Sequence, residues 1–115
     1  KNNVDRWGIY SPSKNLDKCN FKISDVVEKP SSKDAPSNNA VIGRYILHKD
    51  IFKYLENQKK GKGGEIHITD AIRKMILKNY FFIGHKFSGK YLDCGTMRGY
   101  IKSGFEISKL WKFVL

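Results

Sequence analysis

Residues 26–30 of the chain, Val-Val-Glu-Lys-Pro, place a carboxylate and an ammonium side by side where a β-prone run ends. Pro30 cannot donate to a strand ladder, so the strand is expected to stop there. A carboxylate such as Glu28 can accept hydrogen bonds from sugar hydroxyls, and Lys29 can act as a point charge against a phosphate. Adjacent Glu and Lys also occur as a solvated surface pair, so the dipeptide by itself leaves two interpretations open.

A second carboxylate, Asp93, stands at the end of the short run 91–94 and is followed by Gly95. At this place it could cap a following helix or hold a metal ion. Magnesium bound to a nucleotide takes only one or two protein carboxylates and completes its shell with phosphate oxygens and water. A single Asp is therefore chemically sufficient for a share in such a site.

Other candidate motifs are weaker. The segment 59–64 is rich in Lys and Gly, but a phosphate-binding Walker loop needs Ser or Thr after Gly-Lys, and none follows here. Alternation places Glu65, His67 and Thr69 on one side of the chain before a helix. Neither the histidines nor the cysteines have the spacing of a zinc site or a disulfide framework, so free thiols are expected at Cys19 and Cys94.

Several β-prone segments must position these groups. Residues 7–10 and 21–27 predict a hairpin, and the polar, Pro-containing stretch 31–39 predicts a loop. Residues 40–47 predict a buried strand, and further strands are expected within 80–87 and 91–94, the last two from their aromatic and β-branched content.

Helical periodicity appears in three places. One helix is expected from Asp50 to before Gly61, a second after a cap at Thr69 or Asp70, and a third from about Thr96. The second helix would end at a cap near Asn79. It would bury four apolar side chains, those of Ala71, Ile72, Met75 and Ile76. The resulting order, β-β-β-α-α-β-β-α, predicts a mixed α/β fold.

The composition limits the classes of function. In 115 residues, 22 Lys plus Arg against 11 Asp plus Glu give a net charge of 22 − 11 = +11, which favours an anionic partner. The chain is long enough for one small domain, and no apolar run is long enough for a membrane span or a signal sequence, so we expect a cytoplasmic protein. A small basic nucleic-acid-binding module is the competing class, supported by the charge and by aromatic residues interleaved with lysines.

In order along the chain, these strings resemble one family, the bacterial UTP–glucose-1-phosphate uridylyltransferases, or UDP-glucose pyrophosphorylases. The resemblance covers nearly the whole chain, and each motif is weak alone whereas their shared order is strong. The strings are residues 7–9, 27–30, 34–38, 40–47, 63–66, 69–71 and 91–95. The related glucose-1-phosphate thymidylyltransferases share the Glu-Lys-Pro and Leu-Asp-x-Gly elements, so the reaction is implied more firmly than the base.

The resemblance implies a role for each matching residue. Gly8, through its backbone, and Glu28 would bind the glucose hydroxyls, and Val41 would lie against the sugar. Lys29 would neutralise the sugar phosphate during catalysis, and Asp93 would be a catalytic carboxylate on Mg²⁺. The substrates would be UTP and glucose 1-phosphate, and the products UDP-glucose and pyrophosphate.

The family's glycine-rich nucleotide loop, uracil-reading residues and second metal-binding Asp have no counterpart in this sequence. The resemblance therefore implies that residues 1–115 are the carboxy-terminal, sugar-binding portion of a Rossmann-like three-layer fold, inactive alone. We expect the chain to form a homo-oligomer and to act with an amino-terminal half supplied as a separate chain. We do not expect it to bind nucleic acid or a membrane. Thr96-Met97 departs from the family pattern and lacks a lysine common beside the Asp.

Overall fold

A computed structural model describes residues 4–111. A 3-10 turn, Val4–Arg6, leads into strand β1, Gly8–Asn15, which forms an antiparallel hairpin with β2, Asn20–Glu28. Strand β3, Ile83–His85, adds to the other edge of β2, so the sheet order is β1-β2-β3. The expected hairpin is confirmed, although β1 continues past Pro12 with shifts of register on either side of it.

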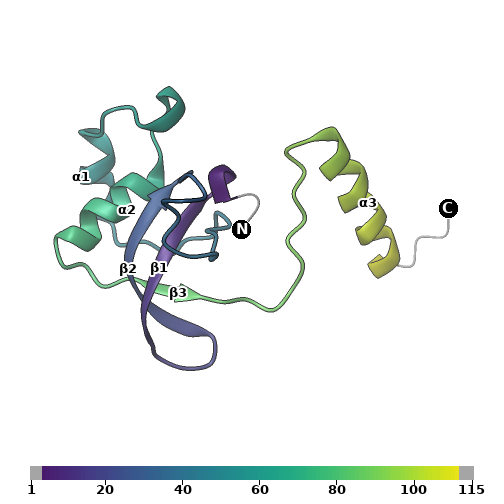
Figure 1. Ribbon diagram of the computed structural model, residues 1–115, viewed down its shortest axis with the longest axis horizontal. Helices are drawn as coiled ribbons and strands as arrows, with labels where there is room; N and C mark the ends of the chain where they lie inside the picture. Colours follow the sequence, from purple (N-terminus) through teal and green to yellow (C-terminus); the bar gives the residue numbers. More distant parts are fainter. Residues whose placement is uncertain (1–3, 112–115) are drawn as a thin grey trace.

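Two helices lie together beside the sheet, α1 at Ile51–Glu56 and α2 at Ile68–Leu77 (Figure 1). Helix α2 packs on β2, and Arg73 ties the two elements together through two hydrogen bonds to the Asp25 carboxylate, of 2.9 and 3.0 Å. Such a paired contact fixes both the distance and the orientation of the two elements. A second 3-10 turn, Lys62–Gly64, connects α1 to α2.

The core lies between α2, α1 and the hairpin. Its buried members come from all three parts of the fold, and they are Tyr10, Val26, Ile51, Ala71, Ile72 and Met75. The helical periodicity of α2 therefore predicts its buried face correctly. The C-cap of α2 is Lys78, one residue before the predicted Asn79. Asn79 follows it with φ +64°, the left-handed conformation that often ends a helix.

Two expected strands do not form. Within 40–47 the only pairing is a bridge between Ala40 and Ile9, and Ile46 is fully exposed. Gly43 adopts φ +74° in the middle of this segment, a conformation incompatible with an extended strand. Residues 91–94 are likewise outside any strand, and only 83–85 of the stretch 80–87 pair with β2.

Helix α3, Met97–Trp111, stands apart from the sheet at the end of an extended arm, residues 86–96 (Figure 1). Thr96 caps it by accepting a 3.0 Å hydrogen bond from the Gly99 amide, so the start predicted near Thr96 is correct. An ion pair between Lys90 and Glu106 holds the helix against the arm. Among residues 4–111, none of the helices has the length and apolar character needed to cross a bilayer.

Candidate sugar-phosphate site

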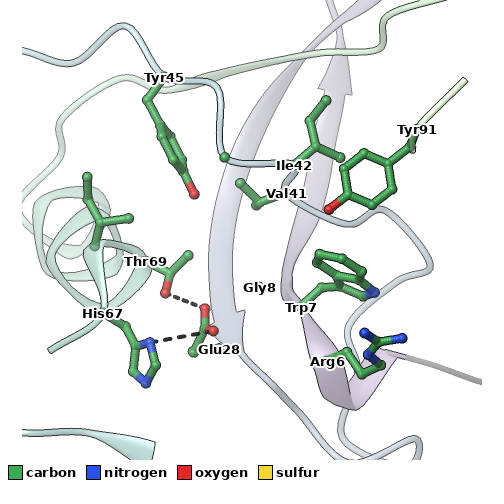
Figure 2. Close-up of a pocket in the computed structure, with 12 residues that line it drawn as sticks. Arg6, Trp7, Gly8, Glu28, Val41, Ile42, Tyr45, His67, Thr69 and Tyr91 are labelled. Carbon is green, nitrogen blue, oxygen red and sulfur yellow. Dashed lines mark hydrogen bonds and ion pairs between the residues drawn. The ribbon is translucent and has the colours of Figure 1, made fainter. Parts of the chain in front are cut away.

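A cavity of about 320 Å³ opens where β1 begins and β2 ends (Figure 2). The antiparallel register places Gly8 opposite Glu28, so the two predicted site residues are neighbours across the hairpin. The loop after β2 returns along β1, where the Val41 amide donates a 2.8 Å hydrogen bond to the Gly8 carbonyl. Gly8, Glu28 and Val41, which are far apart in the sequence, therefore line one cavity. Its volume is within the range of small-molecule sites.

The Glu28 carboxylate is held from two sides. The Thr69 hydroxyl donates a 2.6 Å hydrogen bond to Oε2, and His67 Nδ1 lies 3.7 Å from Oε1. The side chains of Glu28 and His67 are only 12% and 11% exposed. A carboxylate so placed keeps acceptor capacity for a ligand while its orientation is fixed. The carboxylate thus faces the cavity as a ready acceptor of ligand hydroxyls.

Gly8 is required by space. A Cβ at this position would lie 2.7 Å from Thr69 Cγ2, closer than carbon atoms approach one another, and a tight 3.0 Å from Glu28 Oε2. The absence of a side chain lets the backbone of β1 reach the cavity directly beside Glu28. Backbone groups and a carboxylate together suit a ligand that offers several hydroxyls.

Lys29 lies next to Glu28 but its ammonium is directed elsewhere. Lys29 adopts φ +44°, and its Nζ lies 3.6 Å from the Glu65 carboxylate. Its carbonyl accepts a hydrogen bond from the Lys62 ammonium. Lys29 does not belong to the residues that line the cavity.

Asp93 does not line the cavity itself but contacts Arg6, which does. Its Oδ2 lies 3.1 Å from Arg6 Nη2, and its Oδ1 accepts a 2.9 Å hydrogen bond from the Gly95 amide. A Cβ on Gly99 would collide with the Asp93 carbonyl oxygen, so glycine allows the helix start to approach. The helix cap is Thr96, so the capping interpretation of Asp93 is wrong.

Aromatic rings close two sides of the cavity. Trp7 packs edge-to-face on Tyr91 with ring centroids 5.2 Å apart, and Tyr45 lies across from them (Figure 2). Burial, and to a smaller degree the charge of Glu28, raise the pKa of Tyr45. Burial, followed by the charge of Asp93, raises the pKa of Tyr91. Both phenols are therefore protonated at neutral pH by a wider margin than an ordinary tyrosine.

The described residues do not by themselves compose a metal site. Across positions 4–111, no cluster of three or more His, Cys, Asp or Glu side chains is arranged to hold an ion. Asp93 fits magnesium only as one contributing carboxylate, because one of its oxygens is already paired with a guanidinium. Cys19 and Cys94 are free and exposed, as expected.

Some site residues carry a weak sequence signal. Alternation from 65 to 69 correctly groups His67 and Thr69, which line the cavity, whereas Glu65 is exposed and outside the lining. Thr69 lies within α2 and does not cap it. No local motif marks Arg6, Tyr45 and Tyr91 as neighbours. They come together at the cavity only because the loop after β2 and the arm 86–96 both run back toward the start of β1.

Comparison with known proteins settles the family. Residues 1–109 match the family model described as Nucleotidyl transferase. This chain belongs to that family.

Individual members of the Nucleotidyl transferase family resemble the chain closely. It is 54% identical over 83 residues to a UTP–glucose-1-phosphate uridylyltransferase of Pseudomonas aeruginosa, covering 72% of this chain and 29% of that protein. It is 44% identical over 103 residues to the enzyme of the same name from Mycoplasma genitalium, covering 87% and 34%. The chain thus spans about a third of the length of these curated relatives.

Solved structures of family members share its fold. A UDP-glucose pyrophosphorylase complexed with UDP-glucose superimposes with a TM-score of 0.85 at 45% identity, over 92% of this chain and 39% of that one. A UTP-bound enzyme of the same kind from Acinetobacter baumannii gives 0.67 at 31% identity, over 97% and 41%. The expected mixed α/β portion of a nucleotidyltransferase fold is therefore confirmed.

Proposed function

We propose that this chain supplies the sugar-binding portion of a UTP–glucose-1-phosphate uridylyltransferase. The observation that carries the proposal is the cavity in which Gly8, Glu28 and Val41 come together. The likeness of the chain to an enzyme solved with UDP-glucose, at 45% identity, supports the same ligand class here. The uridylyl rather than the thymidylyl reaction is favoured because the relatives named above are uridylyltransferases.

The sugar is bound by groups already in position. Glu28 accepts hydrogen bonds from glucose hydroxyls while Thr69 and His67 hold its carboxylate, and the Gly8 backbone lies beside it. Val41 lies against the sugar as part of the cavity wall. Because these groups are fixed before the ligand arrives, little ordering free energy is lost on binding.

The reaction joins two phosphates. A phosphate oxygen of glucose 1-phosphate attacks the α-phosphorus of UTP, the new P–O bond forms, and the bond to the oxygen leading to the β-phosphorus breaks, releasing pyrophosphate. Lys29 is proposed to neutralise charge on the sugar phosphate, which requires its ammonium to leave Glu65, 3.6 Å away. Positioning and charge neutralisation supply the catalysis, and no protein nucleophile is needed.

Asp93 is proposed as one carboxylate ligand of a catalytic magnesium ion. Oδ2 is already paired with Arg6, and the role requires further ligands from outside the described residues. When bound, magnesium neutralises developing charge on the phosphates. Residues 1–115 are accordingly proposed as the carboxy-terminal part of the catalytic domain, acting with a nucleotide-binding part in a homo-oligomer within the cytoplasm.

The test is an assay of UDP-glucose formation from UTP and glucose 1-phosphate with magnesium. The chain is assayed alone and mixed with the complementary part of the Pseudomonas aeruginosa relative. We expect activity only in the mixture, and none when the chain carries Glu28→Gln. Association of the two parts without activity, together with a chain that binds no UDP-glucose, would contradict the proposal.

The competing polyanion-binding class makes the opposite prediction for Glu28. A basic surface binds nucleic acid with a steep dependence on salt, and Glu28 takes no part in it. In the enzyme, Glu28→Ala abolishes sugar recognition, and any binding of polyanions by the chain barely changes. A Glu28→Ala variant that recognises the sugar as the wild type does would contradict a sugar site at Glu28.

A further inference from the structure

One arginine lines the cavity, Arg6 at the end of the first 3-10 turn. Its guanidinium carbon lies 5.6 Å from the centroid of the Trp7 ring, and its Nη2 lies 3.1 Å from Asp93 Oδ2. Trp7 is in turn fixed by its edge-to-face contact with Tyr91. A ring on one side and a carboxylate on the other therefore orient a flexible side chain before any ligand binds.

Glu28 and Arg6 lie on opposite sides of Gly8 in the cavity (Figure 2). The side of Glu28 is the side of Thr69 and His67, and the side of Arg6 is that of Trp7 and Tyr91. The negative charge of Glu28 repels an anionic group, whereas the guanidinium attracts one, although the Asp93 carboxylate 3.1 Å away offsets part of its charge. The cavity is consequently polarised, with a hydroxyl-binding end and an anion-binding end.

The donor geometry of Arg6 suits a phosphate. The hydrogen bond to Asp93 uses one N–H of the planar fork, and the guanidinium carries further N–H donors that match phosphate oxygens. Its side chain is 44% exposed, so a ligand can reach it. The Lys29 ammonium lies outside the cavity lining and is paired with Glu65, so it can join Arg6 on the phosphate only after it leaves that pair.

We propose that Arg6 binds the phosphate of the sugar phosphate in this cavity. The inference rests on the proposed sugar-binding function and extends it, since it assigns the orientation of the ligand, with hydroxyls toward Glu28 and phosphate toward Arg6. A phosphate on Arg6 competes with Asp93 for the guanidinium. Binding of the sugar phosphate thus loosens the Arg6–Asp93 pair and makes the Asp93 carboxylate available.

The test compares two ligands that differ only at the phosphate end. The ¹⁵N-labelled chain is titrated with glucose 1-phosphate and with methyl α-glucoside, and the indole N–H of Trp7 is followed by NMR, assigned with a Trp111→Phe variant. We expect Arg6→Gln to weaken glucose 1-phosphate binding by about tenfold or more and to change methyl α-glucoside binding by less than about twofold. Arg6→Lys keeps the charge but loses the fork, so an intermediate affinity is expected.

Two controls separate the possible failures. Lys14→Gln removes the same charge from an exposed site on β1 and is expected to leave binding unchanged, which excludes a general effect of net charge. Glu28→Gln is expected to weaken both ligands. An unchanged amide spectrum away from the cavity shows that each variant is folded.

Arg6→Gln that binds glucose 1-phosphate as the wild type does, while Glu28→Gln loses both ligands, would overturn the role of Arg6 and leave the sugar site standing. The same conclusion follows if Lys29→Gln accounts for the whole loss of phosphate affinity. A wild-type chain that binds neither ligand would contradict the sugar site and the role of Arg6 together.

Discussion

Gly8 is the residue at which the least change should do the most damage. A methyl group there would meet Thr69 Cγ2 at 2.7 Å and Glu28 Oε2 at 3.0 Å, so the two groups that build the hydroxyl-binding end must move apart. We expect Gly8→Ala to weaken glucose 1-phosphate binding by about tenfold and to lower the free energy of unfolding by about 1–3 kcal/mol. Calorimetric titration and urea unfolding measure the two effects.

Gly104 offers the matched control. A Cβ there meets nothing within 4 Å on α3, and alanine favours the helix over glycine by about 1 kcal/mol. Gly104→Ala should therefore bind the ligand normally and be no less stable than the wild type. Equal effects of the two substitutions would show that the crowding at Gly8 is unimportant.

For single residues, the local sequence pattern predicts which side chains carry chemistry, but it does not predict which distant residues lie next to one another. Glu28 is recognisable because an acid ends a strand and is followed by a lysine and a proline, and the hairpin register then places it opposite Gly8. The partnership of Arg6 with Asp93 is not recognisable, because 87 positions separate the two residues and no periodicity links them. Chain reversal, not spacing, creates that contact.

Among the elements, α2 contributes most to the core. Met75 is completely buried on its inner face, whereas Leu77 on the same helix is 73% exposed. We expect Met75→Ala to reduce the free energy of unfolding by about 2–5 kcal/mol, because it removes buried apolar area and leaves a cavity. Leu77→Ala should change it by less than about 0.5 kcal/mol. Urea denaturation of both variants checks this, and similar values for the two would contradict the packing of α2 described above.

A tyrosine joins the start of α1 to the segment after α2. The Tyr80 hydroxyl donates a 2.8 Å hydrogen bond to Asp50 Oδ2, which, with burial, raises the pKa of Tyr80 from 10.0 to about 12. A raised folded-state pKa gives stability that is complete below about pH 10 and is lost as the pH rises through about 12.

Tyr80→Phe should consequently be less stable than the wild type at neutral pH, with a difference that shrinks as the pH approaches 12. Unfolding at a series of pH values, with phenolate absorbance followed in parallel, measures it. A difference that does not shrink between about pH 10 and pH 12 would show that the hydrogen bond to Asp50 contributes nothing.

The predictability of elements depends on their partners. The hairpin and the helices follow from residue type and period, which act locally. Residues 40–47 have the composition of a strand, yet a strand forms only against a neighbour with free backbone groups. Only the start of the segment finds one, at the bridge between Ala40 and Ile9. Composition does not reveal that Gly43 turns the chain at φ +74°.

On the scale of the whole molecule, the exposed apolar surface of α3 is the main feature. It includes Tyr100, Ile101 and Phe105, each more than 60% exposed. Surfaces of this kind promote association, while the net charge of +11 opposes it by repulsion. We expect sedimentation velocity to show species heavier than the 13.3 kDa monomer, in a proportion that rises with salt.

Ile101→Gln should reduce that association by removing apolar area from the exposed face. Lys102→Gln, at the adjacent exposed position, should instead increase it slightly by lowering the repulsion. A compact monomer at every salt concentration would show that α3 does not drive self-association under these conditions.

The two free thiols give the molecule a pair of natural labelling positions. Cys19 is in the turn between β1 and β2, and Cys94 follows Asp93 on the arm; both are exposed, and the sequence contains no other cysteine. A donor and an acceptor dye attached to them would report the separation of the hairpin tip and the arm without any substitution. Energy transfer between the dyes would then show, in real time, whether a ligand that separates Arg6 from Asp93 also changes the distance between the arm and the hairpin tip.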